Sequence, residues 1–542
     1  MESMKKVFTV ILAVMMLMTA ITVPGIAEKE LTDFTYVRTF EQNLTDMLNE
    51  AGWTLEDSVW AQAYADELGI RIVSEWTLPT ADEYRAKLGI TIASGELPDM
   101  IRTAGTTSAD FALINELMEN DMLADMTDVF EEYASDELKA YYADAGDEVW
   151  YPVMKDGRKM GIPRLIGAEN SSDCFIWLRQ DWLDNLGLQP PETMDDLLAI
   201  IKAFKDNDPD GNGQDDTIGL YADNTVITSL RGFCNCYHAY PEIWVNDGEG
   251  VGYGSVLPAM KTALEKLAEL YAGGYLQQEF YTMDNLSAME SIVNGTCGAI
   301  FSQQWQGIDR IQACYDNNPD ASWVAYLLPS CDDEPVRPQT SLNAGDFMLV
   351  TSECEHPEFV IQMLNLFIEK AWLGTQEDYY TYFNSEGIER WCFSPVALEP
   401  IGKNYYLNEI PLKEAVETRS QDGLTLPAHF NLYDHAVRWL DNHENEWHGW
   451  YNIYGDETAS NYKIGHYLDN DLFMFNAYCN APTESMSLYW NALQTMEQEI
   501  ITQIITGAKT VDDFDAFVDT WMSSGGADCV EEVNAWYAGI AG

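Results

Sequence analysis

Apolar residues follow two alternating spacings along the chain after its N-terminal region. Short apolar runs at 34–37, 70–73 and 100–101 are typical of strands. Between them, residues 60–68 and 82–92 repeat their apolar positions with the period of a helix. Strands that alternate with helices at this spacing pair in parallel, so the pattern predicts an α/β fold.

Helical patterns dominate the rest of the chain. They cover 178–185, 194–205, 260–271 and the stretch from Glu414 onwards, where 488–505 is the clearest case. Thr193 precedes the second of these helices as a good N-cap, and Asp196 stands three residues later. The sequence shows no internal repeat and no low-complexity linker, which indicates closely connected domains.

The charge balance limits what the protein can bind. The 542 residues include 89 acidic and 29 basic side chains, which gives a net charge of −60 at pH 7. Nucleic-acid backbones and anionic membranes are bound through Lys and Arg, so we exclude a general nucleic-acid-binding protein and a polybasic membrane anchor. With 46% hydrophobic residues the chain can still bury a core, and its length predicts two to four domains.

The N-terminus has the layout of an export signal. Lys5 and Lys6 precede an apolar run at 7–23, and small residues before Glu28 suit a cleavage site. We therefore expect residues 1–27 to be a signal peptide, with an N-terminal membrane anchor as the alternative. The mature protein is then expected outside the membrane, either extracellular, at the cell surface or periplasmic.

Ten cysteines in an exported chain permit disulfides, but their connectivity cannot be read from spacing. Cys234 and Cys236 form a C-x-C pair that suggests a redox or metal site, and buried free thiols are an equal alternative. No cysteine occurs before Cys174, so the signal region lacks the residue that would accept a lipid.

An acidic loop at 208–217 directly follows the predicted helix that ends near Lys205. Its oxygen ligands fall at positions one, three, five and nine of an EF-hand calcium loop, and the carbonyl of position seven adds another. These positions are Asp208, Asp210, Asn212, Asp216 and, for the carbonyl, Gln214. Gly219 stands where the usual bidentate Glu would be. The loop predicts a structural Ca²⁺ site, and a solvated acidic turn is the alternative.

Several motifs occur in one order along the chain. They are Ala-Ser-Gly-Glu-Leu-Pro-Asp at 93–99, Asp-Gly-Arg-Lys-Met-Gly-Ile-Pro at 156–163, Arg-Gln-Asp-Trp-Leu-Asp-Asn-Leu-Gly-Leu at 179–188, the acidic loop, and Asn-Gly-Thr-Cys-Gly at 294–298 before Trp305. Because it has these motifs in this order, the chain resembles the extracellular solute-binding proteins of ABC transporters (family 1). The resemblance is to the large calcium-containing group with alginate- and oligosaccharide-binding members. Thr217 departs from it, since relatives often carry Glu there.

The resemblance implies a two-lobed type II periplasmic-binding-protein-like fold, with ligand enclosed in the cleft between the lobes. By analogy the N-lobe takes 33–150 plus 322–375, and the C-lobe takes 151–321 plus 376–542, which includes the calcium loop. The implied function is capture of a carbohydrate, an oligosaccharide, for delivery to membrane permease subunits. The protein would act as a monomer and bind no nucleic acid.

Sugar rings stack on aromatic faces and need polar groups for their hydroxyls, and the chain has 17 Trp and 29 Tyr. The candidate ligand-binding residues are Trp305 with Gln304 after a predicted strand at 298–301, Trp447 and Trp450, and more weakly Trp76, Arg164 and Trp177. For each tryptophan, packing in the core is the alternative.

Catalytic motifs are absent from the sequence. His443 and His448 are five residues apart, whereas a metalloprotease helix needs four. There is no G-x-S-x-G and no G-K-[ST]. A glycosidase carboxylate pair is defined by distance and cannot be found from spacing. We therefore predict a binding protein and not an enzyme. The alternatives are a secreted polysaccharide-degrading enzyme, or the same fold with a peptide or another solute as ligand.

Overall fold

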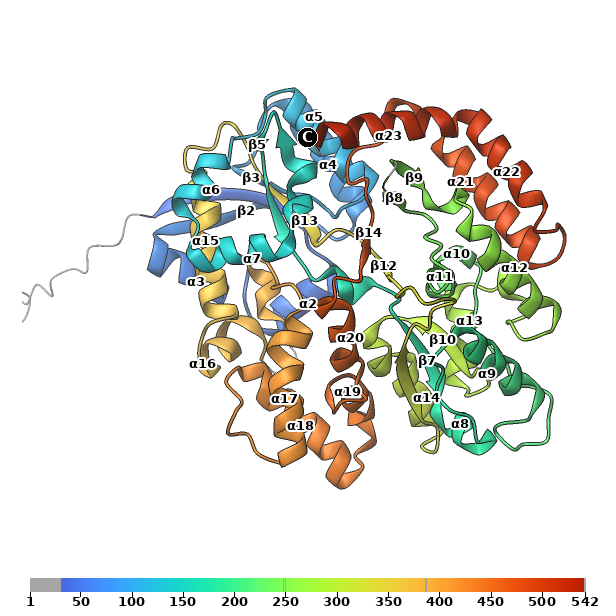
Figure 1. Ribbon diagram of the computed structural model, residues 1–542. Helices are drawn as coiled ribbons and strands as arrows, with labels where there is room; N and C mark the ends of the chain where they lie inside the picture. Colours follow the sequence, from blue (N-terminus) through green and yellow to red (C-terminus); the bar gives the residue numbers. More distant parts are fainter. Residues whose placement is uncertain (1–30, 247, 249, 386–387, 541–542) are drawn as a thin grey trace, which may run out of the picture.

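The computed structural model describes residues 31–540 except 247, 249, 386 and 387. The chain forms two lobes, each with its own β-sheet and hydrophobic core, and a group of helices below them (Figure 1). The expected α/β two-lobed architecture is confirmed. The predicted signal peptide at 1–27 lies outside the described residues.

The first lobe is built on a five-stranded sheet in the order β2-β1-β3-β13-β6. Its strands are β1 (Thr32–Thr39), β2 (Ile70–Leu78), β3 (Met100–Arg102), β6 (Ile162–Leu165) and β13 (Ala344–Val350). β1 pairs in parallel with β2 and β3, which confirms the predicted parallel strands, whereas β13 runs antiparallel to β3 and β6. Phe34, Tyr36 and Val37 of β1 are fully buried because this strand lies inside the sheet.

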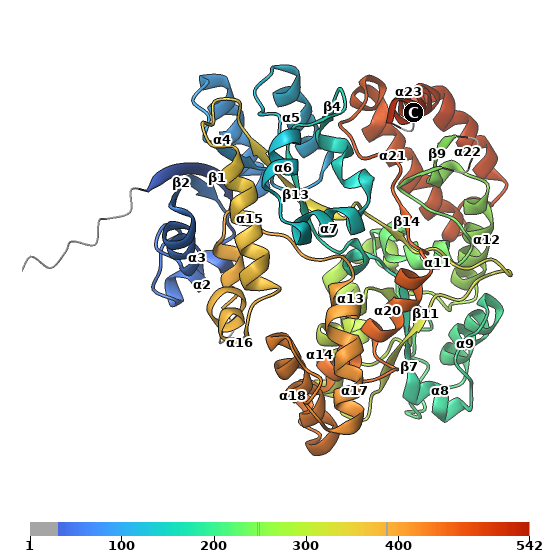
Figure 2. The same cartoon turned by 60° about the vertical axis from the view of Figure 1, so that its left-hand side comes forward.

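Helices cover this sheet, as Figure 2 shows for α4 and α15. They are α2 (Gln42–Glu50), α3 (Val59–Ala63), α4 (Ala81–Ser94), α5 (Ser108–Glu119), α6 (Thr127–Tyr133), α7 (Asp136–Ala145) and α15 (Glu358–Ala371). The Thr80 hydroxyl caps α4 by accepting from the Glu83 N–H, and Gly95 ends that helix with φ of +75°. The hairpin β4 (Met154–Lys155) and β5 (Arg158–Lys159) lies at the edge of the lobe.

The second lobe contains a three-stranded antiparallel sheet in the order β10-β7-β11. Its strands are β7 (Phe175–Arg179), β10 (Ala299–Ser302) and β11 (Trp323–Leu327), and a separate hairpin joins β8 (Trp244–Asn246) to β9 (Val251–Tyr253). The helices around them are α8 (Gln180–Leu186), α9 (Met194–Asp206), α10 (Val226–Ser229), α11 (Arg231–Asn235), α12 (Ala259–Ala272), α13 (Asn285–Val293) and α14 (Arg310–Asn317). The capping box of Thr193 and Asp196 at the start of α9 is confirmed.

The start of the predicted helix at 178–185 is wrong by two residues. β7 runs to Arg179, and all five of its residues are buried. A short apolar run that is buried on both faces has no periodicity, so it cannot be distinguished from the start of a helix by pattern alone.

The C-terminal part is helical, as expected. It contains α16 (Gln376–Asp378), α17 (Ile410–Thr418), α18 (Pro427–Asn442), α19 (His448–Tyr454), α20 (Ser460–Asp469), α21 (Glu484–Ile505), α22 (Asp513–Trp521) and α23 (Ala527–Ile540). The last three complete the second lobe, whereas α17, α18 and α19 form the lower helical group (Figures 1 and 2). β12 (Gln339–Thr340) and β14 (Met474–Phe475) pair at the centre of the molecule between the lobes (Figure 1).

The residue numbers at which the predicted N-lobe and C-lobe begin and end stay a prediction. The first core gathers residues between 34 and 165, between 342 and 371, between 393 and 398, and also Cys479. β11, which the predicted division assigns to the N-lobe, pairs with β7 in the second lobe. The sheets therefore draw on distant parts of the chain, and more than one segment crosses between the lobes.

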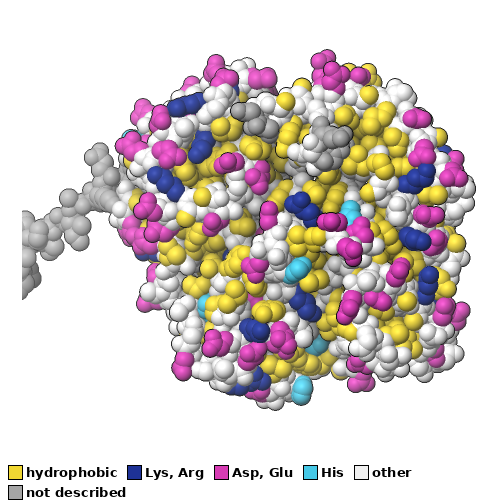
Figure 3. Space-filling model, viewed as in Figure 1, with side chains coloured by type: hydrophobic (Ala, Val, Ile, Leu, Met, Phe, Trp, Pro, Cys, Tyr) yellow, Lys and Arg dark blue, Asp and Glu magenta, His cyan; other side chains and the backbone are white. Residues whose placement is uncertain are grey.

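All ten cysteines are free thiols, and most of them are buried. Among the described residues, none of the helices combines the length and the apolar character needed to cross a bilayer. Acidic side chains are spread over the visible face of the molecule, and basic ones are fewer (Figure 3).

Candidate functional site

A large cavity lies between the end of α15 on one side and α18 and α19 on the other. Its volume is about 640 Å³, which is within the range of small-molecule sites. Six aromatic side chains line it, namely Trp372, Tyr379, Phe383, Trp447, Trp450 and Tyr454. Two of them, Trp447 and Trp450, are residues that the sequence predicted to bind ligand.

The first wall is fixed by the core of the first lobe. α15 buries eight of its fourteen residues and ends at Ala371, so the next residue, Trp372, is delivered to the edge of the cavity. The Trp372 Nε1–H donates to the carbonyl of Leu398 at 2.9 Å. The Lys403 ammonium lies 4.9 Å from the centre of the Trp372 ring and pairs with Glu399. This indole is therefore held in one orientation before any ligand arrives.

The opposite wall is an aromatic cluster on α18, on α19 and on the 3-10 turn Asn445–Trp447 that leads into α19. The His435 ring stacks on Trp447 with centroids 3.9 Å apart, and Trp450 stacks on Tyr454 at 6.1 Å. Burial lowers the pKa of His435 below its ordinary value, so its imidazole is neutral at pH 7. Its Nδ1 atom is buried and has no hydrogen-bond partner among the described residues. Such an atom is costly unless a ligand or a water satisfies it.

Polar side chains are placed between the aromatic ones. Asn384, Asn408 and Asn431 line the cavity with Thr375. Primary amides can donate and accept at the same time, which suits a ligand rich in hydroxyl groups. The described lining residues include two lysines and no Asp or Glu, although the chain has 89 carboxylates. The arrangement can stack and hydrogen-bond a ligand, and it supplies no carboxylate pair for glycoside hydrolysis.

Gln304 and Trp305 lie elsewhere, beside Asn170 in the segment that precedes β7. The Gln304 amide donates to the Asn170 Oδ1 at 2.6 Å, and the Trp305 Nε1–H donates to the Asn170 carbonyl at 3.1 Å. The Trp305 side chain is 41% exposed, whereas Gln304 is buried. Neither residue lines the cavity between α15 and α18–α19. Their role in ligand binding stays a prediction.

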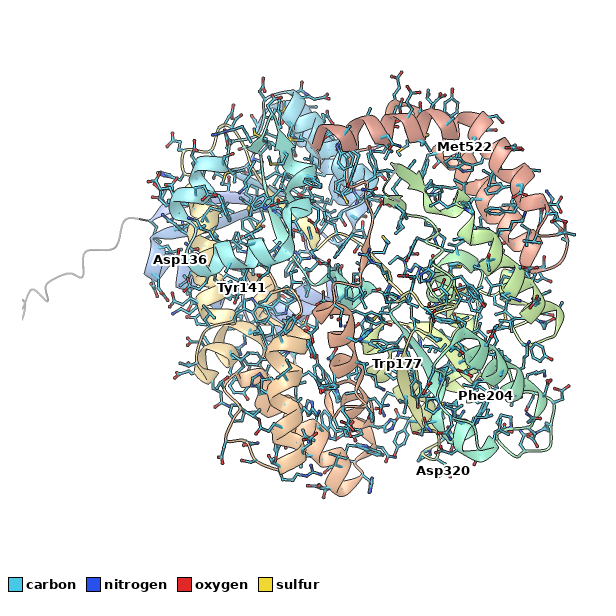
Figure 4. The ribbon with its side chains drawn as sticks, viewed as in Figure 1. Asp136, Tyr141, Trp177, Phe204, Asp320 and Met522 are labelled. Atoms are coloured by element: carbon cyan, nitrogen blue, oxygen red, sulfur yellow. The ribbon has the colours of Figure 1, made fainter. Side chains whose placement is uncertain are left out.

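The other three candidate ligand-binding residues, Trp177, Arg164 and Trp76, each contact other groups of the protein. Trp177 is fully buried inside the second lobe (Figure 4), and its Nε1–H donates to the Gln303 carbonyl at 3.0 Å. Arg164 pairs with Asp346 at 2.5 Å, and the Lys87 ammonium lies 4.4 Å from the centre of the Trp76 ring. Their ligand-binding role also stays a prediction, and in this structure Trp177 presents no surface to a ligand.

A second cavity of about 370 Å³ lies directly between the two lobes. The loop before α5, at 106–108, forms one side, and Trp244, Tyr478 and Trp490 form part of the other. Trp244 stacks on Trp490 with centroids 5.7 Å apart. Sequence reasoning missed both of these tryptophans and also Trp372. Their local sequence differs little from that of a core tryptophan, so no signal marked them.

The acidic loop at 208–217 is held together by hydrogen bonds among its own residues, and its role as a Ca²⁺ site stays a prediction. Asp208 begins it with φ of +48°, and the Gly213 N–H, at position six, donates to the Asp208 Oδ2 at 3.0 Å. The Asn212 amide nitrogen donates to the Asp210 Oδ2 at 2.9 Å and to the Asp216 Oδ1 at 3.2 Å. Partial burial and these neighbouring carboxylates raise the pKa of Asp210. The two carboxylates therefore face one common point, at which negative charge is crowded.

The amino-acid sequence matches a known protein family and several known proteins. A family model described as bacterial extracellular solute-binding protein matches residues 60–372. The chain is 31% identical to lipoprotein LipO of Bacillus subtilis over 231 residues, which is 40% of this chain and 41% of that protein. It is also 31% identical to the fructooligosaccharide ABC transporter substrate-binding protein FusA of Streptococcus pneumoniae over 163 residues, 29% of each chain. The matches thus span well under half the length of these relatives.

Two solved structures share the fold over almost the whole chain. FusA in complex with kestose superposes with a TM-score of 0.56 at 16% identity and covers 94% of this chain and 99% of that one. The alginate-binding protein AlgQ2 without calcium ion gives a TM-score of 0.55 at 14% identity, with 93% and 98% covered. At these identities the superpositions show the fold.

Proposed function

The chain belongs to the bacterial extracellular solute-binding proteins, and from this membership we propose that it captures an oligosaccharide for an ABC importer. The cavity of about 640 Å³ between α15 and α18–α19 is the observation that supports an oligosaccharide as the ligand. Its aromatic walls offer stacking faces for sugar rings, and its amide side chains offer partners for hydroxyl groups. FusA, which shares the fold, is described in complex with kestose.

The partners follow from the same role. A binding protein of an importer releases its ligand to permease subunits in the membrane, so the chain is proposed to work outside that membrane as a monomer. The net charge of −60 supports a partner other than nucleic acid, because phosphate backbones repel such a surface.

Binding without turnover is the proposed outcome for the ligand. Hydrolysis of a glycosidic bond needs two carboxyl groups, one on each side of the bond. Among the described lining residues of the cavity between α15 and α18–α19 there is no carboxylate. The purified protein is therefore expected to release no reducing ends from any glycan that it binds, and measurable release would move it to the enzymes.

We further propose that the loop at 208–217 holds a structural Ca²⁺ ion. Asp208, Asp210, Asn212 and Asp216 would supply side-chain oxygens, and Gln214 its carbonyl. The convergence of the Asp210 and Asp216 carboxylates on one amide nitrogen supports this, because a cation at that point would relieve their repulsion. A FusA EF-hand mutant is among the solved structures that share the fold. The ion would fix the connection after α9.

Isothermal titration calorimetry against neutral and uronic-acid oligosaccharides tests the proposal. Trp450→Ala removes a stacking face from the cavity, and we expect it to weaken binding by about 2 kcal/mol, roughly 30-fold. Trp53→Ala is the matched control, because Trp53 is also partly buried but does not line the cavity. Saturable binding that Trp450→Ala weakens and the control does not would support the site. Absence of binding across the whole panel, with peptides bound instead, would overturn the ligand class.

A further inference from the structure

Two segments that are far apart in the sequence are joined beside β12, the strand that pairs with β14 between the lobes. The end of α11 and the turn after it contact β12 and the segment that leads into it, through both backbone and side-chain groups. The Cys331 N–H donates to the Cys236 carbonyl at 3.0 Å. The Gln339 N–H donates to the Asn235 Oδ1 at 2.9 Å, and the Asn235 amide donates back to the Gln339 side chain at 2.9 Å. These bonds fix both segments relative to each other.

Three metal-binding side chains converge at this junction. His238 has φ of +54°, and this left-handed conformation ends the turn, where the Ala239 N–H donates to the Cys234 carbonyl. The His238 Nε2 lies 3.0 Å from the Asp332 Oδ1, and the Cys331 thiol completes the group. The three ligand atoms all lie within 4.8 Å of one another. In the part of the chain that the structure describes, no other set of three His, Cys or carboxylate ligands is this close.

The chemistry of this group selects the metal. Nitrogen, sulfur and oxygen ligands together suit Zn²⁺, whereas Ca²⁺ takes oxygen ligands only. Around a tetrahedral Zn²⁺ the ligand atoms lie about 3.3–3.8 Å apart, given bonds of about 2.0–2.3 Å. Side-chain rotations are therefore enough to close the site. The His238 and Asp332 side chains are 26% and 53% exposed, so a water can take the fourth position.

We propose that His238, Cys331 and Asp332 form a zinc-binding site that is separate from the acidic loop and from the ligand cavity. The ion would clamp the turn after α11 to the segment that enters β12. The C-x-C pair that the sequence singled out lies next to this site, but it supplies a backbone anchor through Cys236 and no ligand in the group.

The test uses the full mature chain, reduced and freed of metal, in excess Ca²⁺ so that oxygen-only sites are filled. Zn²⁺ is titrated against a chromophoric competitor. We expect one ion per chain, and Cys331→Ser and His238→Ala should each weaken the apparent Kd at least about tenfold. Cys354→Ser is the matched control, because Cys354 is the other thiol that is not buried and it lies outside the group. Its affinity should match the parent protein.

Cobalt provides a second readout that does not depend on affinity. Co²⁺ bound through a thiolate gives a charge-transfer band in the near ultraviolet, which we expect in the parent protein and in Cys354→Ser but not in Cys331→Ser. Tm without metal should be unchanged in the variants, because Cys331 is exposed and His238 is partly exposed. The proposal is wrong if no Zn²⁺ binds, if both variants bind it as tightly as the parent, or if the Co²⁺ spectrum lacks the thiolate band.

Discussion

Folding removes the Glu497 carboxyl group on α21 from water. Glu497 is 2% exposed, and the Tyr253 hydroxyl donates to the Glu497 Oε2 at 2.9 Å. No Lys or Arg among the described residues forms an ion pair with it. Burial raises the pKa of Glu497 to about 7. An ionised Glu497 is therefore unfavourable in the folded protein, and this makes stability depend on pH.

The sign and size of this dependence follow from proton linkage. Because the pKa of Glu497 is raised in the folded state, the folded chain keeps a proton that the unfolded chain releases near pH 4.5. The contribution of Glu497 is fully present below that pH and is lost as pH rises through about 7. One pKa unit corresponds to 1.36 kcal/mol, so a rise from 4.5 to about 7 amounts to about 3 kcal/mol.

Glu497→Gln removes the ionisation and keeps an oxygen that can accept from Tyr253. We expect the variant to gain about 2.5 kcal/mol relative to the parent protein between pH 5 and pH 8, slightly less than the full value because the unfolded carboxyl group is still partly protonated at pH 5. The assay is urea unfolding at pH 5, 6, 7 and 8, followed by tryptophan fluorescence. The outcome is judged from how the difference in unfolding free energy between variant and parent changes with pH. Any cost of burying the new amide is the same at every pH, so it does not affect that change.

Glu499→Gln is the matched control, since Glu499 is exposed on the same helix. It should follow the parent protein at every pH. Some dependence should remain in Glu497→Gln, because burial also raises the pKa of Glu169 to about 7. If Glu497→Gln keeps the full pH dependence of the parent protein, the carboxyl group is not desolvated as the structure indicates, and the reasoning fails.

Three further predictions concern the calcium loop, the tryptophans and the buried ion pairs. Chelation of Ca²⁺ with EDTA should lower Tm, and Asp208→Ala with Asp210→Ala should abolish that sensitivity; an unchanged melting curve would contradict the metal site. Trp305 does not line the proposed ligand cavity, so Trp305→Ala should leave both oligosaccharide affinity and stability nearly unchanged; a loss of about 30-fold in affinity would place the ligand beside Trp305 instead. Trp177→Ala should instead cost about 3–5 kcal/mol of stability by calorimetry, because its ring is fully buried. Asp346→Ala leaves the buried Arg102 and the partly buried Arg164 without their partner and should cost about 3–5 kcal/mol in a urea melt; a loss below about 1 kcal/mol would show that water reaches them.

Local elements of the fold could be read from the sequence. The strands β1, β2 and β3 and the helix α9 lie where their periodicity and caps predict them. Their signals are local, since Thr193 and Asp196 are three residues apart and the capping box needs nothing else. The acidic loop is similar, because all of its proposed ligands fall between Asp208 and Asp216. A resemblance of ordered motifs then led to the family and to the two-lobed fold.

The walls of the ligand cavity were decided by tertiary structure. Trp372 and Trp450 are 78 positions apart and meet at one cavity only because α15 and α19 pack on either side of it. Trp177 was a weaker candidate than Trp447 in sequence, and for both of them packing in the core was the alternative. In the structure Trp177 is fully buried and Trp447 lines the cavity. Whether an aromatic ring faces a core or a ligand depends on its neighbours from distant segments.

The proposed zinc site, like the ligand cavity, depends on tertiary structure and not on local sequence. His238 and Cys331 carry no motif together, because 93 positions separate them. Contacts between the two segments, such as the hydrogen bond from the Cys331 N–H to the Cys236 carbonyl, bring their side chains to one point. Sequence spacing encodes contacts within a turn, a helix or a loop, since the chain geometry there is fixed by a few torsion angles. Contacts between segments depend on which faces bury the most apolar surface together, and that is settled by the packing of the whole chain.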